Sequence, residues 1–218
     1  MVSIMGGLFI TFEGSEGSGK STQVVLLVEK LRADGHEVVT VREPGGTPTG
    51  EAIRDILQHD AAGEDICAET ETLLFESSRA QLVSNVIKPA LERGAVVISD
   101  RFADSTTAYQ GYGRGFDVEV LLQLHAFAMG GLEPDITLLI DVDIEEGFRR
   151  IQLRNRDKNI GLDRMERESF EFHQRVYDGY QAMAQRWPER FCVIDGKRSP
   201  SEIEVDVWAK ISKVIDEY

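Results

Sequence analysis

The chain has 218 residues, of which 42% are hydrophobic, and this suits one domain with a substantial buried core. Its net charge of −14 argues against a general binder of nucleic acids or of anionic membranes, because both surfaces attract basic proteins. The two cysteines, Cys67 and Cys192, lack metal-ligand spacing, and no run approaches the roughly 20 apolar residues of a membrane helix.

Short apolar runs alternate along the chain with segments of helical periodicity. The apolar runs predict strands at Leu8–Phe12, Glu37–Val41, Ala95–Ser99, Ile136–Asp141 and Phe191–Ile194. The periodic segments predict helices at Ser21–Arg32, Gly50–Gln58, Glu69–Arg93, Asp117–Met129, Ile144–Arg154, Met165–Arg186 and Pro200–Glu217. Such alternation is typical of parallel strands joined by right-handed crossovers, so we expect a three-layer α/β fold with a parallel five-stranded sheet.

Two segments interrupt this alternation. Glu43–Thr49 is a turn-rich loop directly after the second predicted strand, and Leu153–Arg164 is polar and charged, as expected of a mobile surface segment between helices. Pro89 should kink or end the long third helix. No linker, repeat or N-terminal signal segment is evident, so we expect a single cytoplasmic domain over residues 1–218, with a lid near residues 153–164.

A phosphate-binding loop follows the first predicted strand. The segment Gly14–Ser21 fits the pattern G-x-x-x-x-G-K-[ST] and opens the first predicted helix, which is the context that this motif requires. Its glycines let backbone amides face phosphate oxygens, and the helix N-terminus adds partial positive charge. Lys20 would reach the β- and γ-phosphates, and Ser21 would ligate Mg²⁺. The predicted nucleotide-binding residues are Gly14, Ser15, Glu16, Gly17, Ser18, Gly19, Lys20 and Ser21.

A carboxylate near the metal is expected at the end of a neighbouring strand. Asp100 and Asp141 both end apolar runs. We favour Asp100, because Arg101 follows it directly and a charged pair at a strand end indicates a site. Either aspartate could instead only end its strand.

The polar segment Leu153–Arg164 holds three arginines, Arg154, Arg156 and Arg164. Arginines that close over a triphosphate can stabilise the charge on the transferring phosphoryl group, and a closing lid excludes water. The alternative is a solvated run of charges. The chain lacks the Asn-Lys-x-Asp motif that reads guanine, which argues against a GTPase.

Several motifs together resemble the thymidylate kinase family, over roughly residues 8–195. These are Phe12-Glu13-Gly14, Arg42-Glu43-Pro44-Gly45-Gly46-Thr47, Leu74-Phe75-(x)3-Arg79, Asp100-Arg101-Phe102 with Ser105, Ala108-Tyr109-Gln110-Gly111, and Leu162-Asp163-Arg164-Met165-Glu166. The resemblance implies a fold like that of P-loop nucleoside monophosphate kinases. It also implies Mg²⁺-dependent phosphoryl transfer from ATP to dTMP, and a homodimer packed through helices.

The resemblance also implies roles at the acceptor site. Phe75 would stack on the thymine ring, and Arg79 would donate hydrogen bonds to the base edge. Thr106 falls where the family places a polar base contact, and Arg101 would hold the phosphate of dTMP. Taken alone, Phe75 could instead be a core residue and Arg79 a solvated helix residue.

Three further positions receive roles from the resemblance. Tyr109 would press against the sugar and disfavour a 2′-hydroxyl, with plain packing as the alternative. Glu16 would accept a hydrogen bond from the 3′-hydroxyl. Pro44 would form a rigid turn, suited to a cis peptide bond, beneath the acceptor. The role of Glu43 stays open between pairing with Arg42 and ending the strand.

One departure from the family pattern concerns the source of the catalytic arginine. Some members place an arginine in the phosphate loop beside the acidic residue, whereas here Gly17 follows Glu16. The chain therefore resembles the subgroup that supplies this arginine from the lid. We expect Arg154 or Arg156 to have this role, with Arg164 next.

Phosphoryl transfer depends mostly on positioning and charge neutralisation, so we expect Lys20 and Arg101 to act together with the lid arginines. We assign no catalytic role to any of the four histidines, which are His36, His59, His125 and His173. Two alternatives stay open: a kinase acting on another deoxynucleotide or on a nucleoside, and a nucleotide-binding switch without turnover.

Overall fold

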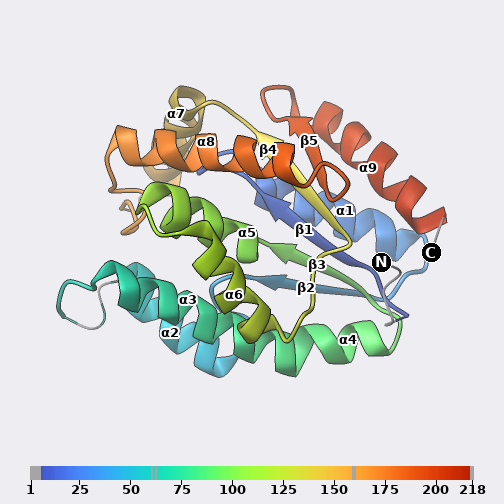
Figure 1. Cartoon of the computed structure of the whole chain (residues 1–218). Coiled ribbons are helices and arrows are strands. Elements are labelled where there is room, and N and C mark those ends of the chain that lie inside the picture. The colour runs from blue at the N-terminus through green and yellow to red at the C-terminus, as the bar shows by residue number, and fades with distance from the viewer. Residues whose placement is uncertain (1–5, 60, 62, 159–160, 217–218) are drawn as a thin grey trace.

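The structure, a computed structural model, describes residues 6–59, 61, 63–158 and 161–216. At its centre lies a sheet of five parallel strands in the order β2-β3-β1-β4-β5 (Figure 1). The strands are β1 (Phe9–Glu13), β2 (Val38–Arg42), β3 (Val96–Asp100), β4 (Ile136–Asp141) and β5 (Phe191–Asp195). Each lies within one residue of its predicted position, so the predicted parallel sheet is confirmed.

The burial of the strands follows from their order in the sheet. The central strand β1 is buried along its whole length, as expected of a strand covered on both faces. The edge strands β2 and β5 have exposed positions. Phe12 of β1 and Arg42 of β2 both pair with Asp100 of β3, so the carboxyl ends of these strands lie side by side. In α/β folds this edge of the sheet is where ligands bind.

Helices cover both faces of the sheet and complete the three layers (Figure 1). The helical elements, with π-helical turns written η, are α1 (Lys20–Ala33), α2 (Pro48–His59), α3 (Ala68–Leu82), η1 (Val83–Ile87), α4 (Lys88–Glu92), α5 (Ala103–Thr106), η2 (Thr107–Gly113), α6 (Val118–Met129), α7 (Ile144–Lys158), α8 (Phe170–Arg186) and α9 (Pro200–Asp216). Within the described ranges, no helix has both the length and the apolar character needed to cross a bilayer.

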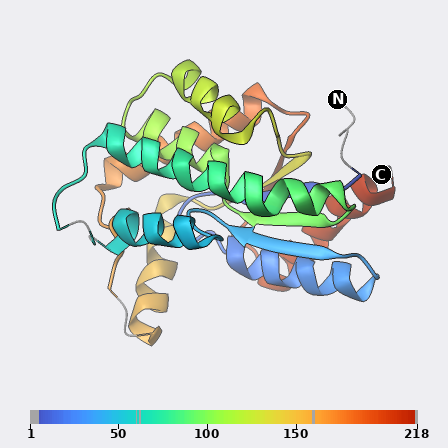
Figure 2. The same cartoon turned by 90° about the horizontal axis from the view of Figure 1, so that it is seen from below.

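Two cores lie on opposite faces of the sheet. On one face α1 and α9 contribute Leu27, Leu31, Val207 and Ile211 to a cluster with the strands. On the other face the elements from α3 to α6, together with η2 and α8, pack against the strands. Figure 2 shows α7, in gold, standing out from these layers. This helix contributes much less to the cores than α1 or α8, and it carries the first part of the predicted lid.

The predicted helix Glu69–Arg93 is interrupted, as expected from Pro89. The chain runs from α3 into the π-helical turn η1, which ends at Ile87, and then into α4, where Pro89 occupies the first turn. Proline lacks an N–H and its ring clashes with the carbonyl four residues earlier, so the wider turn just before it relieves this clash.

Two predicted helix boundaries were wrong. Leu153–Lys158 belongs to α7, because this stretch has no glycine or proline, so the lid segment begins as helix. The last long helix before β5 begins at Phe170, because the Ser169 hydroxyl accepts from the Phe172 amide and caps it there. The short elements α5 and η2 were not predicted. Asn159, Ile160 and the predicted helix end Glu217 lie outside the described residues.

Candidate functional site

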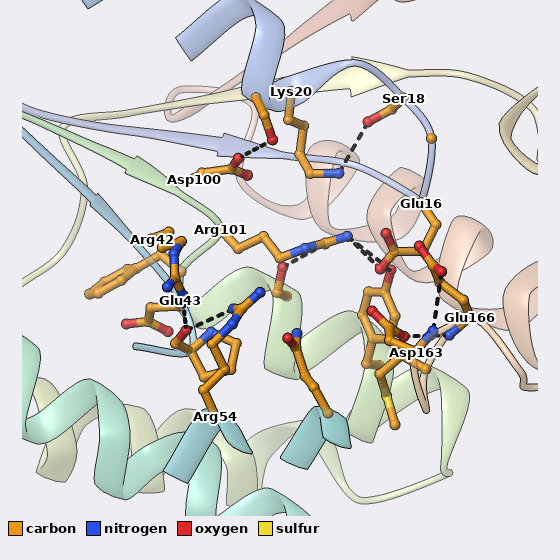
Figure 3. A pocket seen from close by; sticks show the side chains of 18 of the residues that line it. Glu16, Ser18, Lys20, Arg42, Glu43, Arg54, Asp100, Arg101, Asp163 and Glu166 are labelled. Carbon is orange, nitrogen blue, oxygen red and sulfur yellow. Dashed lines mark hydrogen bonds and ion pairs between the residues drawn. The ribbon is translucent and has the colours of Figure 1, made fainter. Parts of the chain in front are cut away.

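A cavity of about 640 Å³ lies at the carboxyl ends of β1, β2 and β3. The phosphate loop forms one wall, and residues of α2, α3, η2 and α7 form the others (Figure 3). Among the described residues, seven cationic side chains line it: Lys20, Arg42, Arg54, Arg79, Arg101, Arg150 and Arg154. In a chain with a net charge of −14, such a concentration of positive charge indicates an anionic ligand.

The phosphate loop has the backbone that its glycines predict. Gly14, Gly17 and Gly19 all adopt positive φ angles, of 140°, 72° and 96°. The ammonium group of Lys20 lies inside the loop and donates to the carbonyl oxygens of Gly14 and Ser15, both at 3.0 Å. Burial, followed by repulsion from Arg101, lowers the pKa of Lys20 to about 8. The lysine is therefore held where phosphate oxygens could replace the loop carbonyls as its partners.

A close backbone contact joins this loop to α7. A Cβ atom on Gly17 would lie 2.3 Å from the carbonyl oxygen of Gly147, and one on Gly147 would lie 2.5 Å from that of Glu16. Neither position has room for a side chain while α7 keeps its place. This contact explains why the residue after Glu16 is glycine and not arginine.

Of the two candidate metal carboxylates, only Asp100 adjoins the loop. Its Oδ2 atom accepts a hydrogen bond from the Ser21 hydroxyl at 2.5 Å, and both residues line the cavity. Asp141 accepts instead from Gln181 at 2.9 Å and is not among the described residues that line the cavity. The preference for Asp100 over Asp141 is therefore supported by geometry.

Arg101 occupies the centre of the cavity in a left-handed backbone conformation, with a φ of 71°. Its Nη2 atom donates to Glu16 at 2.7 Å (Figure 3). Its Nη1 atom donates to the Gly14 carbonyl at 3.2 Å. Tyr109 also donates to Glu16, at 2.9 Å. Burial alone would raise the pKa of Glu16, but the charges of Arg101 and Lys20 and the Tyr109 hydrogen bond lower it to about 2.

The predicted base-binding residues lie together at the far end of the cavity. Phe75 is partly exposed and lines the cavity, so it is not a core residue. Arg79 is only 1% exposed, which excludes the alternative of a solvated residue. It donates to Glu43 at 2.7 Å and to the Thr106 hydroxyl at 2.9 Å, and it also pairs with Glu76. Glu43, whose role was open, therefore pairs with Arg79.

The three lid arginines do not act as one group in this structure. Arg154 lines the cavity and pairs with Glu166 at 2.5 Å. The side chain of Arg156 is 74% exposed, and Arg156 does not belong to the described lining of the cavity. Arg164 also points elsewhere, since its guanidinium donates to the Leu57 carbonyl at 2.7 Å and pairs with Glu71 at 2.6 Å.

In this structure Arg156 and Arg164 therefore lie away from the described lining of the cavity. Glu71 is 1% exposed, and a buried carboxylate requires cationic partners, so it holds Arg164 away from the cavity. Arg156 lies two positions from Arg154 on α7, and residues at this spacing face different sides of a helix.

Two cavity arginines were missed from the sequence. Arg150 donates to the carbonyl oxygens of Ser18 at 3.4 Å and Gly196 at 3.0 Å, and Arg54 donates to that of Pro44 at 2.9 Å. The spacing of four residues between Arg150 and Arg154 places both on one face of α7. The helical pattern could therefore have predicted Arg150 as a cavity residue once Arg154 was proposed. Arg54 had no comparable signal. The peptide bond before Pro44 is cis, as the resemblance implied.

Comparisons with known proteins agree with this geometry. A family model described as thymidylate kinase matches residues 12–207. A thymidylate kinase from Synechococcus sp. (strain JA-2-3B'a(2-13)) is 47% identical over 204 residues, which cover 94% of each chain. One from Pelotomaculum thermopropionicum is 47% identical over 214 residues, 98% of this chain and 97% of the other. A crystal structure of thymidylate kinase from Ehrlichia chaffeensis superposes with a TM-score of 0.75 at 36% identity, covering 94% of this chain and 98% of the other.

The low pKa of Glu16 leads to a prediction about stability. Because the folded-state value of about 2 lies below the ordinary value of 4.5, the ionised carboxylate stabilises the fold fully above pH 4.5. This stabilisation is lost as the pH falls toward 2. Between about pH 5 and pH 3 the wild type should lose about 1–2 kcal/mol more of its free energy of unfolding than Glu16→Gln. Urea denaturation at each pH measures this difference.

Glu29→Gln is the matched control, because it removes an exposed carboxylate from α1. It should follow the wild type over the same pH interval. If Glu16→Gln and the wild type lose equal stability, Glu16 does not have the low pKa described here.

Proposed function

The chain belongs to the thymidylate kinase family, and we propose that its central cavity transfers the γ-phosphoryl group of ATP to dTMP, giving dTDP and ADP for dTTP synthesis. The observation that carries this proposal is the place of Arg101. Its guanidinium is hydrogen-bonded to the Gly14 carbonyl and to Glu16 of the phosphate loop, in the same cavity as Phe75. An acceptor phosphate bound to Arg101 would lie next to the end of a triphosphate held by the loop.

The acceptor end of the cavity fits a thymine nucleotide. The Phe75 ring offers a stacking surface, which is worth about 1–3 kcal/mol for a base. Arg79 and Thr106 form a preorganised polar edge for the base, since they are already hydrogen-bonded to each other. Arg101 and Arg54 both line the cavity, and a guanidinium group can donate two parallel hydrogen bonds to a phosphate dianion.

The sugar would lie between the base and the phosphate, beside Tyr109 and Glu16. The Tyr109 hydroxyl donates to Glu16, which is ionised at neutral pH and so can accept from a 3′-hydroxyl. The Tyr109 ring lies against the guanidinium of Arg101, 5.2 Å away, so it has little freedom to make room for a 2′-hydroxyl.

The donor end is formed by the phosphate loop and α7. Lys20 would exchange its bonds to loop carbonyls for bonds to the β- and γ-phosphates of ATP. Arg154 lies on the cavity, where it can neutralise charge on the transferring group after leaving Glu166. The acceptor phosphate is already ionised, so the reaction requires no strong general base.

Ser21 and Asp100 fit a Mg²⁺ ion. Their adjoining hydroxyl and carboxylate oxygens are the hard donors that this ion prefers, and Mg²⁺ commonly takes one or two protein ligands together with substrate phosphates. When bound, the ion would neutralise charge on the β- and γ-phosphates.

We also propose a single phosphate-loop domain in which residues 153–164 close as a lid. The cytoplasm is the proposed compartment, because Cys67 and Cys192 are free thiols and suit a reducing environment.

A panel of acceptors tests the proposed reaction. ADP formation from ATP and Mg²⁺ should be fast with dTMP, weaker with dUMP, and slow with dCMP, dGMP and the ribose form of TMP. A pocket for one methyl group discriminates by only about 1–3 kcal/mol, whereas an unpaired polar group or a steric clash discriminates more strongly. Lys20→Ala should lower kcat by orders of magnitude in the same assay. Tight ATP binding without turnover on any acceptor would favour a nucleotide-binding switch instead.

The lid arginines can be separated by mutation. Arg154→Ala should lower kcat with dTMP by about 10²-fold or more, because it removes a charge from the reacting phosphates. Arg156→Ala is the matched control on the same helix and should keep kcat within about threefold of the wild type. Full activity of Arg154→Ala would exclude it as the catalytic arginine, and a large loss in Arg156→Ala would show that the lid rearranges to bring Arg156 to the phosphates.

We further propose that the protein is a homodimer formed through α6. Val120, Leu124 and Phe127 have the spacing i, i+4, i+7, which places them on one face of the helix, and Phe127 is 89% exposed. An exposed apolar stripe of this kind is typical of an interface. Phe127→Glu should convert a dimer into a monomer in light scattering, whereas Val205→Glu, at an exposed position on the solvent face of α9, should not. A monomeric wild type would contradict this proposal.

A further inference from the structure

Glu13 is a fully buried carboxylate beside the cavity that the proposed mechanism has not used. It ends β1, is 0% exposed, and is not among the described residues that line the cavity. Its Oε1 atom accepts from the backbone amides of Phe102 at 2.7 Å and Ser105 at 3.3 Å. Its Oε2 atom accepts from the hydroxyls of Ser105 at 2.6 Å and Tyr180 at 3.0 Å.

The same two hydroxyls are bonded to Arg101. The Nη1 atom of Arg101 lies 3.1 Å from the Ser105 hydroxyl and 3.3 Å from that of Tyr180. A guanidinium can only donate and an ionised carboxylate can only accept. Both hydroxyls must therefore accept from Arg101 through their lone pairs and direct their protons toward Glu13. The two hydroxyls also lie 3.0 Å from each other, and either one can be the donor in this bond. In both cases at least one hydroxyl proton is donated to the carboxylate of Glu13.

Glu13 also holds the backbone that follows Arg101. Phe102 precedes the first turn of α5, and no side chain of its own caps that turn. The carboxylate of Glu13 takes this place by accepting from two of the amides at the start of the helix. A non-glycine residue with positive φ persists only where its surroundings hold it, and these bonds hold the chain directly after Arg101.

Glu16 and Glu13 thus act on different terminal nitrogens of the Arg101 guanidinium. Glu16 binds Nη2 directly and faces the cavity, so ligands can reach it. Glu13 acts on Nη1 through Ser105 and Tyr180 from the buried side. We propose that Glu13 is a positioning residue that sets the orientation of Arg101 for the acceptor's phosphate through the hydroxyls of Ser105 and Tyr180. This inference rests on the proposed function, in which Arg101 binds that phosphate.

Glu13→Gln tests the inference with little change in volume. The amide oxygen can still accept from the backbone, but the amide nitrogen would donate to the hydroxyls and turn their protons toward Arg101. Two donors would then face each other. Burial, and next the charge of Asp104, raise the pKa of Glu13 to about 7, so the assays are run above that pH, where the wild-type residue is ionised.

Binding of dTMP and of thymidine, which lacks the phosphate, is compared by calorimetry and by competition. Loss of a hydrogen bond to a charged group costs about tenfold or more in affinity. Glu13→Gln should therefore weaken dTMP binding by about tenfold or more. It should change thymidine binding and the KM for ATP by less than about twofold. Tyr180→Phe removes one of the two hydroxyls and should weaken dTMP binding in the same selective way, by about two- to fivefold.

Asp104→Asn is the matched control. It removes another buried carboxylate from the same segment, one that pairs with Arg190 at 2.6 Å. It should lower the melting temperature while leaving the ratio of dTMP to thymidine affinity unchanged. If Glu13→Gln does not fold, Tyr180→Phe decides the question through the same ratio.

Two results would overturn the inference: an unchanged affinity ratio in Glu13→Gln or Tyr180→Phe, or an equal change of this ratio in Asp104→Asn. A wild-type protein that neither binds nor phosphorylates dTMP would instead refute the proposed function. The two failures are therefore distinguishable.

Discussion

The arrangement of the site depends on one guanidinium group held from two sides. Arg101 follows β3, where the chain takes a left-handed turn. It is bonded to the phosphate loop on one side and to the hydroxyls of Ser105 and Tyr180 on the other. Those bonds join β1, β3, α5 and α8 at one point. Because a guanidinium offers donors in a rigid plane, each partner restricts the others, and the two halves of the cavity are fixed relative to each other.

Local features of the sequence predict the parts of the site that depend on short stretches of chain. The strands follow from apolar runs, and the loop Gly14–Ser21 follows from its glycines and its place between a strand and a helix. The side-chain directions of Arg156 and Arg164 could not be predicted in this way. They depend on a buried carboxylate distant in sequence and on how far α7 continues. The element η2 was missed for a similar reason, since its residues Ala108 and Tyr109 pack against α8, which is distant in sequence.

Charge is distributed very unevenly over this molecule. The chain as a whole carries −14, yet cationic side chains gather on one cavity. Several of them, such as Arg79 and Arg101, are already matched by carboxylates from within the fold. The cavity is therefore neutralised in part before any ligand arrives, which limits the self-repulsion of so many cations. An acidic exterior around a cationic interior also directs anionic molecules to one place.

The contact between Gly17 and Gly147 has a consequence for how such enzymes can diverge. Two backbones touch where either Cβ atom would collide with a carbonyl oxygen, so neither glycine can be replaced while the other segment stays in place. A descendant that acquired an arginine after Glu16 would have to shift the start of α7 in the same step, and with it Arg150 and Arg154. An arginine at position 17 therefore requires coordinated changes in both segments, and chains that carry only one of these changes should be rare.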